Sequence, residues 1–389
     1  MFDNDQQLTA IAAEFGTPTY VYDLDAVTGR LRRLQEVMPD ARIRYAVKAN
    51  ASAAVLSALA ADGAGVEAIT LGELTRALKA GVPAARILIG GPAQGDSMRE
   101  AAVAHGAGTV SLDSVSQWRD WQRDLAAGRF SAPRFLVRVN PALDPRTHEH
   151  LATGSGDSKF GMAPEVALAL ARELAGAGLF EGYHVHAGSQ IGDLGVFRAV
   201  LAALGPLYDA QPGPTLDIGG GYRVPDFPLA EYASLISDFT GSRGLRLIIE
   251  PGRYLVAEAG VLLTRVLHVK EGEVTHVIAD AGMADLLRPA LYGASHPLRV
   301  VAAGAREPVL VDLDGPLCEN ADRLGRDVLL ASPARGDLLA VGHAGAYGFG
   351  MASNYASSLR PAEVVVSGGV ARLARRREEP ADLVLTEVD

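Results

Sequence analysis

The stretch IRYAVKAN, residues 43–50, contains an apolar and aromatic run, YAV, that is followed by a lysine, Lys48. Such a run is typical of a strand buried in a parallel sheet. A lysine at its end can extend to water with its aliphatic stem packed on the core. It can instead be enclosed, where burial favours a neutral amine that attacks a carbonyl. The stretch alone leaves both interpretations open.

Seven more runs of this kind follow, separated by segments with helical spacing. The eight predicted strands are IRYAVK (43–48), GVEAI (65–69), ILIG (87–90), TVSLDS (109–114), FLVRVN (135–140), GYHVHAG (182–188), TLDIGG (215–220) and LRLIIE (245–250). Helices are predicted at 26–38, 71–80, 164–175 and 229–239, from apolar residues three and four positions apart. Eight strands alternating with helices predict an α/β fold, a (β/α)8 TIM-like barrel; a doubly wound open sheet is the alternative.

The placement of polar and glycine residues favours the barrel. Lys48, Asn140, His186, the glycine run 219–221 and Glu250 all lie at or just past the carboxyl ends of predicted strands. In a barrel these ends converge on one mouth, where the chemistry of such folds takes place.

After about residue 258 the pattern changes to strand-like segments separated by turns. These segments are GVLLTRVLHVK, VTHVIADAG, EPVLVDLDG and LLAVGHAG, and TPTYVYD (17–23) resembles them. We therefore predict a barrel over residues 26–258 and a β-rich domain formed by residues 1–25 and 259–389.

Composition excludes several classes of protein. A net charge of −10 over 389 residues argues against a nucleic-acid-binding protein, which needs a basic face. The single cysteine, Cys318, excludes an internal disulfide and fits a reducing compartment. The first residues, MFDNDQQLTAIAAEFG, lack the features of a signal peptide, and no apolar run is long enough to cross a bilayer. A cytoplasmic location is expected.

Three motifs suggest chemistry at the mouth. DIGGGY (217–222) exposes backbone N–H groups that suit a phosphate, although a tight turn explains it equally well. EPGR (250–253) offers a carboxylate for a protonated ring nitrogen and an arginine for an anion, or simply an internal ion pair. HVHAGSQ (184–190) offers a ring-stacking histidine and a serine donor beside a core histidine, His184. A lysine, a phosphate site and a carboxylate for a ring nitrogen are what pyridoxal phosphate requires; we expect no metal.

With these residues in view, the chain resembles the alanine-racemase-like (fold type III) pyridoxal-phosphate decarboxylases, and among them the diaminopimelate decarboxylases. The resemblance extends almost from end to end. It is carried by GTPTYVYD, YAVKAN, GELTRALKAGV, SLDS, RVNP, TG–SKFG (153–161), HAGSQI, DIGGGY, EPGR, DAGMADLLRPALY (280–292), GPLCENAD and GAYG–MASNY. It implies a barrel followed by a β-domain.

The resemblance also implies which residues bind the cofactor, pyridoxal 5′-phosphate. Lys48 would bond to its aldehyde, His186 would stack on its ring, and Glu250 would face the ring nitrogen. The remaining cofactor-binding residues would be Ser189, Gly219, Gly220, Gly221, Gly252, Arg253 and Tyr347.

For the substrate, the resemblance implies an amino acid with a distal charged end. Its binding residues would be Arg253, Arg288, Tyr292, Glu319 and Tyr347. Cys318 would protonate the carbon that loses CO2. Cys318 and Glu319 would act on the barrel of a partner subunit, so a homodimer is expected.

The implied activity is decarboxylation of meso-2,6-diaminopimelate to L-lysine. A related decarboxylase for ornithine, lysine or a specialised biosynthetic amino acid is the first alternative, and a non-catalytic cofactor-binding protein is the second. Some positions depart from the family pattern: Glu67 and Leu71 stand where Asp and Gly are usual, and Ala187 stands where Ile is usual. Such changes in pocket walls alter substrate discrimination by about 1–3 kcal/mol.

Overall fold

The computed structural model describes residues 2–143 and 158–388, and the chain divides into two compact units. One unit comprises residues 28–254. The other joins the residues up to Val27 with those from Leu255 onward. The assignment of cofactor binding to one unit, and of substrate and partner-subunit residues to the other, stays a prediction.

The unit of residues 28–254 contains a closed barrel of eight parallel strands, which pair in chain order and close with the last strand against the first. The strands are β2 (Ala41–Ala46), β3 (Gly65–Ala68), β4 (Ile87–Ile89), β5 (Thr109–Leu112), β6 (Arg134–Arg138), β7 (Phe180–His184), β8 (Thr215–Asp217) and β9 (Arg246–Ile249). The predicted barrel is confirmed, and the open sheet is excluded because Ile43 of β2 lies opposite Ile249 of β9.

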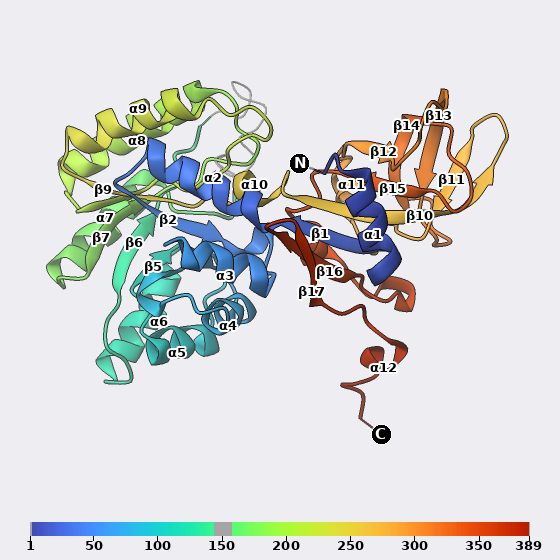
Figure 1. Ribbon diagram of the computed structural model, residues 1–389. Helices are drawn as coiled ribbons and strands as arrows, with labels where there is room; N and C mark the ends of the chain where they lie inside the picture. Colours follow the sequence, from blue (N-terminus) through green and yellow to red (C-terminus); the bar gives the residue numbers. More distant parts are fainter. Residues whose placement is uncertain (1, 144–157, 389) are drawn as a thin grey trace. The chain divides into compact units, whose positions relative to one another are not determined.

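Helices alternate with these strands (Figure 1). They are α2 (Leu24–Val37), α3 (Ala53–Ala61), α4 (Leu71–Lys79), α5 (Asp96–His105), α6 (Val115–Ala126), α7 (Pro164–Gly176), α8 (Leu194–Ala210), α9 (Leu229–Gly241) and α10 (Arg253–Val256), with 3-10 turns η1 (Val47–Ala49) and η2 (Ala84–Arg86). Local sequence features fix where two of these helices begin. The Thr70 side chain accepts a hydrogen bond from the Glu73 N–H at the start of α4, and Pro164 is the first residue of α7. No helix among the described residues is long and apolar enough to cross a membrane.

Several barrel strands end earlier than predicted. The strand predicted at 215–220 stops at Asp217, because Gly219 and Gly221 have φ of 69° and 91°, which an extended strand does not adopt. The strand predicted at 182–188 lies at Phe180–His184. Lys48 is likewise in η1 rather than in β2. The polar residues therefore lie on the turns just past the strands.

The second unit is built on a nine-stranded mixed sheet in the order β14-β13-β11-β10-β1-β16-β17, with β15 pairing β10 and β12. Its strands are β1 (Thr19–Asp23), β10 (Gly260–Lys270), β11 (His276–Ala279), β12 (Leu298–Val300), β13 (Pro308–Asp314), β14 (Arg323–Ala331), β15 (Leu338–Val341), β16 (Ala362–Ser367) and β17 (Val370–Arg375). The predicted association of the N-terminal strand is confirmed: β1 lies between β10 and β16 (Figure 1).

This unit also contains short helices, and one of eleven residues that the sequence interpretation missed. They are α1 (Asp5–Phe15), α11 (Arg288–Tyr292), α12 (Pro380–Leu383), η3 (Phe349–Met351) and η4 (Tyr355–Ser357). In α1, Leu8, Ile11 and Ala12 are buried in the same cluster as Val261 of β10 and Val364 of β16. Spacing of three and four residues gives α1 this apolar face.

Inside the barrel, an apolar layer underlies the polar mouth. Leu88, Leu136 and Ile248, from β4, β6 and β9, form one buried cluster. Side chains two positions apart share a face of a strand, so Arg138 and Glu250 follow Leu136 and Ile248 on the inner side. The cluster therefore forms a floor beneath those two polar side chains.

Candidate functional site

Lys48 forms an ion pair at the barrel mouth. Its Nζ lies 2.7 Å from Oε2 of Glu67, which projects from the neighbouring strand β3. The Lys48 side chain is 33% exposed and the Glu67 side chain 5%. The amine is thus neither fully enclosed nor simply extended to water: a buried carboxylate holds it. Sequence reasoning noted Glu67 only as a departure from the family, although an acid within an apolar strand was a usable signal.

Glu250 places a carboxylate in a dry environment directly after β9. It is 3% exposed, and among the described residues its Oε1 has no hydrogen-bond partner. Its Oε2 lies 3.6 Å from Nε2 of His184. Burial raises the pKa of Glu250 well above its ordinary value and lowers that of His184 well below it, so the contact joins neutral groups. A buried acceptor without a donor costs about 1–3 kcal/mol, which a ligand N–H would offset.

His184 and Asp217 complete this cluster. Ser111 Oγ and His184 Nδ1 are 2.7 Å apart. Asp217 Oδ1 accepts from the Gly219 N–H at 2.9 Å, whereas Oδ2 has no partner among the described residues. Ligand atoms of His184, Asp217 and Glu250 lie within 4.8 Å of one another, a spacing that also suits a metal ion. The expected absence of a metal stays a prediction.

Asp217→Asn is expected to stabilise the cofactor-free protein more at about pH 7.5 than at about pH 5. Burial raises the pKa of Asp217 from 3.8 to about 7. Between these two pKa values the Asp217 carboxyl is ionised in the unfolded chain but protonated in the folded chain. This carboxyl therefore makes the stability of the wild type fall as pH rises, by up to about 1.4 kcal/mol per pH unit. Thermal unfolding at both pH values measures the difference. The exposed Asp209→Asn is the control, and a pH-independent gain would contradict the assignment.

The glycine turn after β8 forms a close-packed cradle. A Cβ on Gly220 would lie 2.2 Å from the Glu250 carbonyl oxygen, and one on Gly221 would lie 2.2 Å from that of Gly188. The Gly219 carbonyl accepts from the Glu250 N–H at 2.7 Å, which joins the turn to the EPGR segment. Only glycine fits these positions, and the lack of side chains lets an anion approach the backbone of the turn.

His186 lies against this cradle. Its Nδ1 accepts from the Gly220 N–H at 3.2 Å. Burial, reinforced by the charges of Lys48 and Arg138, lowers the pKa of His186 to about 3. The imidazole is therefore neutral over the physiological range, a flat ring suited to stacking. Nearby, Arg253 Nη2 lies 3.4 Å from Ser189 Oγ.

Arg138, absent from the predicted site residues, adds a cation near the mouth. It pairs with Asp113 at 2.8 Å and affects the pKa of His184, His186 and Glu250. The other Asp113 oxygen accepts from the Gly161 N–H. Its position in RVNP, at the end of β6, was a usable signal.

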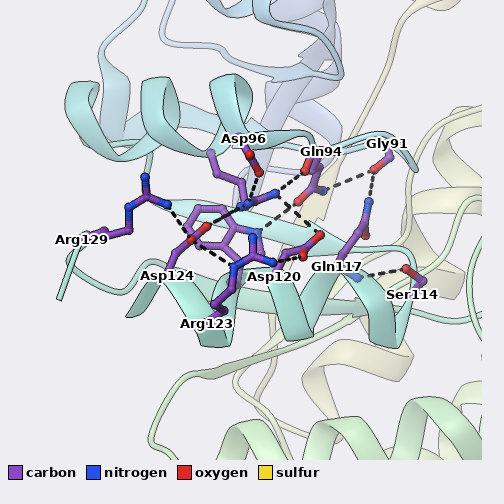
Figure 2. A network of polar contacts seen from close by, with 11 residues as sticks. Gly91, Gln94, Asp96, Ser114, Gln117, Asp120, Arg123, Asp124 and Arg129 are labelled. Carbon is purple, nitrogen blue, oxygen red and sulfur yellow. Dashed lines mark hydrogen bonds and ion pairs between the residues drawn. The ribbon is translucent and has the colours of Figure 1, made fainter. Parts of the chain in front are cut away.

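A buried polar network supports the loops that follow β4 and β5 (Figure 2). Gln94 and Gln117 both donate to the Gly91 carbonyl, and Gln117 also accepts from the Asp113 N–H at 2.6 Å. Arg99, 1% exposed, contacts Asp124 at 2.8 Å and the Gln94 carbonyl at 2.9 Å. Fully satisfied buried networks of this kind make their surroundings rigid.

The remaining predicted site residues lie in the β-rich unit. Arg288 is the first residue of α11 and Tyr292 is the last, and the Tyr292 side chain is largely exposed. Cys318 and Glu319 lie in the loop between β13 and β14; Cys318 is exposed, and Glu319 Oε2 lies 3.5 Å from the Tyr355 hydroxyl. Tyr347 follows β15 and has φ of 55°. Thr153 and Gly154 of the TG–SKFG motif lie outside the described residues.

Asp322 holds the loop that carries Cys318. Its carboxylate accepts from the Leu317 N–H at 2.6 Å and from the Met283 N–H at 2.5 Å. Asp322 is 2% exposed, and a Cβ on Gly315 would collide with it. The sequence interpretation missed this role.

Comparison with known proteins gives consistent matches. Residues 24–257 match the family described as pyridoxal-dependent decarboxylase, pyridoxal binding domain. The diaminopimelate decarboxylase of Deinococcus radiodurans is 43% identical over 379 residues, covering 97% of each chain, and that of Zymomonas mobilis is 38% identical, covering 98% of this chain and 95% of its own. The crystal structure of diaminopimelate decarboxylase from Helicobacter pylori complexed with L-lysine has a TM-score of 0.90 and 32% identity, covering 97% of this chain and 98% of that chain.

Proposed function

We propose a substrate and residue roles from one premise: this chain belongs to the family of pyridoxal-dependent decarboxylases. It is a carboxy-lyase that depends on pyridoxal 5′-phosphate. The proposed reaction converts meso-2,6-diaminopimelate to L-lysine and CO2. The observation that carries the chemistry is the convergence of Lys48, Glu250 and the glycine turn on one barrel mouth.

The residues present fit the cofactor. The buried Oε1 of Glu250 lacks a hydrogen-bond partner among the described residues, and a protonated ring nitrogen would supply one. The cradle at Gly219, Gly220 and Gly221 admits no side chain, so a phosphate could approach its backbone closely. Ser189, Gly252 and Arg253 would complete the phosphate site, and Tyr347 would close over the cofactor.

When bound, the pyridoxal ring takes up the electron pair released from the bond between Cα and the carboxylate. The protein supplies placement and protons. Lys48 Nζ must lose a proton before it bonds to the aldehyde, and Glu67 Oε2, 2.7 Å away, can accept that proton. Neutral His186 supports the ring face without adding charge. Glu250 would face the ring nitrogen and stabilise the proton on it.

The substrate residues lie in the β-rich unit except for Arg253. Arg253 and Arg288 would bind the distal carboxylate, Glu319 would bind the distal ammonium, and Tyr292 would contribute a hydroxyl. A substrate whose distal end carries both charges requires both kinds of partner. Support for diaminopimelate also comes from the relatives of that name, which match almost the whole chain.

We also propose a homodimer in the cytoplasm, in which Cys318 and Glu319 act on the partner's barrel. The exposure of Cys318, Tyr292 and Glu319 within one subunit supports this arrangement.

A substrate panel tests the proposed function. CO2 release is measured with meso-diaminopimelate, L-lysine and L-ornithine under identical conditions. The largest kcat/KM is expected for diaminopimelate, because the two arginines have no partner on lysine or ornithine. Faster turnover of lysine or ornithine would contradict the assignment, and binding without CO2 release would indicate a non-catalytic protein.

Cys318→Ala is expected to lower kcat about a hundred-fold, the usual range for loss of a positioned proton donor. Cofactor affinity should change little, because the Cys318 thiol is proposed only to protonate the carbon that has lost CO2. Turnover and pyridoxal phosphate binding are measured in parallel, with Cys318→Ser as the conservative variant. Equal losses of both would indicate a structural role.

Mixing Cys318→Ala with Lys48→Ala tests the sharing of sites between subunits. Each variant alone is nearly inactive, but a mixed dimer contains one site with both native residues. Restored CO2 release after subunit exchange is therefore expected. A mixture that exchanges subunits but stays inactive would contradict shared sites.

A further inference from the structure

A histidine outside the predicted motifs contacts the arginine proposed to bind the distal carboxylate. Arg288 Nη1 and His296 Nε2 are 3.0 Å apart. On the other side of the ring, His296 Nδ1 and the Gly342 carbonyl oxygen are 2.9 Å apart. His296 is 7% exposed. The imidazole therefore bridges the start of α11 and the loop that follows β15.

The two contacts define the chemical state of the ring. A carbonyl oxygen can only accept, so Nδ1 must carry the proton. A guanidinium can only donate, so Nε2 must present its lone pair to Arg288. Both bonds form together only in the neutral ring with the proton on Nδ1.

The backbone around His296 is held by a strand pair. Leu298 of β12 lies opposite Val341 of β15, and the Gly342 N–H donates to the Pro297 carbonyl at 2.7 Å. Helix α11 ends at Gly293 in the left-handed conformation, φ 61°. The chain therefore turns back, and residue 296 meets residue 288.

We propose that His296 is a positioning residue for Arg288 and thereby sets affinity for the substrate's distal carboxylate. This inference rests on the proposed function. Both χ angles of the imidazole are restrained by the Gly342 bond, whereas an arginine side chain alone has many rotamers. A fixed acceptor reduces the ordering needed when the carboxylate binds, which improves affinity. His296 is given no role at the reacting carbon, so its replacement is expected to raise KM and to leave kcat nearly unchanged.

Three substitutions separate this role from simple packing. In the holoenzyme, His296→Leu and His296→Asn are expected to raise KM for meso-diaminopimelate about ten-fold, with kcat nearly unchanged, since neither keeps an acceptor at the Nε2 position. His296→Gln places its amide oxygen near that position but loses the bond to Gly342, so its KM should lie between that of wild type and those of the other two variants. Equal KM changes in all three variants, or losses confined to kcat, would overturn the inference.

NMR of the histidine side chains tests the contact between His296 and Arg288 directly, because it does not depend on the rate of turnover. In wild-type holoenzyme with 15N-labelled histidine, the signal lost in His296→Gln should be that of a ring protonated on Nδ1, and its Nε2 resonance should shift in Arg288→Met. If the enzyme decarboxylates diaminopimelate while the His296 ring is protonated on Nε2 or is insensitive to Arg288→Met, this inference is overturned and the proposed function stands. Absence of CO2 release from wild type would instead overturn the proposed function, whatever the ring shows.

Discussion

Replacing Lys48 with alanine or arginine is expected to lower kcat by about a thousand-fold or more. The amine is the only group at the mouth proposed to bond to the cofactor aldehyde. Alanine removes it and leaves the buried Glu67 without this cation. Arginine keeps the charge and can still pair with Glu67, but a guanidinium stays protonated and is no nucleophile. The Arg variant thus separates covalent bonding from electrostatics.

The measurement is CO2 release at saturating pyridoxal phosphate, together with the visible absorbance of the bound cofactor. Lys79→Ala is the matched control, because Lys79 is exposed at the end of α4. Near wild-type turnover in Lys48→Arg would show that the charge is sufficient and that Lys48 is not the bonding residue.

Glu250→Gln is expected to lower kcat about a hundred-fold to a thousand-fold, the range for removing one preorganised electrostatic contact. The amide is nearly the same shape and still fits the dry space beside His184 and Asp217. It cannot ionise, whereas Glu250 would take up a negative charge opposite the protonated ring nitrogen of the bound cofactor and keep the proton there. Glutamine also removes a buried acid whose pKa is raised by burial, so folding should not suffer.

Turnover, cofactor affinity and thermal stability are compared for Glu250→Gln and the control Glu273→Gln, an exposed position between β10 and β11. The expected pattern is a large loss of kcat with stability maintained. If kcat were unchanged, Glu250 would not face the ring nitrogen. If turnover and stability fell together, its role would be structural.

The barrel could be predicted because each strand is a local apolar run, and because parallel strands bring their carboxyl ends to one side. That single rule predicts Lys48, His186 and Glu250 at the mouth. Helix boundaries were likewise local: α4 and α7 begin at residues 71 and 164, as predicted from the apolar spacing.

What could not be predicted depends on contacts between distant positions. The cluster of His184, Asp217 and Glu250 joins three strands, and its raised and lowered pKa values arise from burial that no local pattern reports. The observed end of β8 differs from the predicted one because the glycines after Asp217 adopt positive φ, which interrupts the hydrogen-bond ladder between strands. The missed helix α1 is different, because Asn4 caps it and its apolar spacing is visible in the sequence.

Borohydride reduction of the holoenzyme followed by peptide mapping is the most direct test of the central claim. The sequence contains only four lysines, Lys48, Lys79, Lys159 and Lys270, so each possible attachment site lies in a distinct peptide. The pyridoxyl group is predicted on Lys48 alone. A label on any of the other three, or none in an enzyme that releases CO2, would contradict the account.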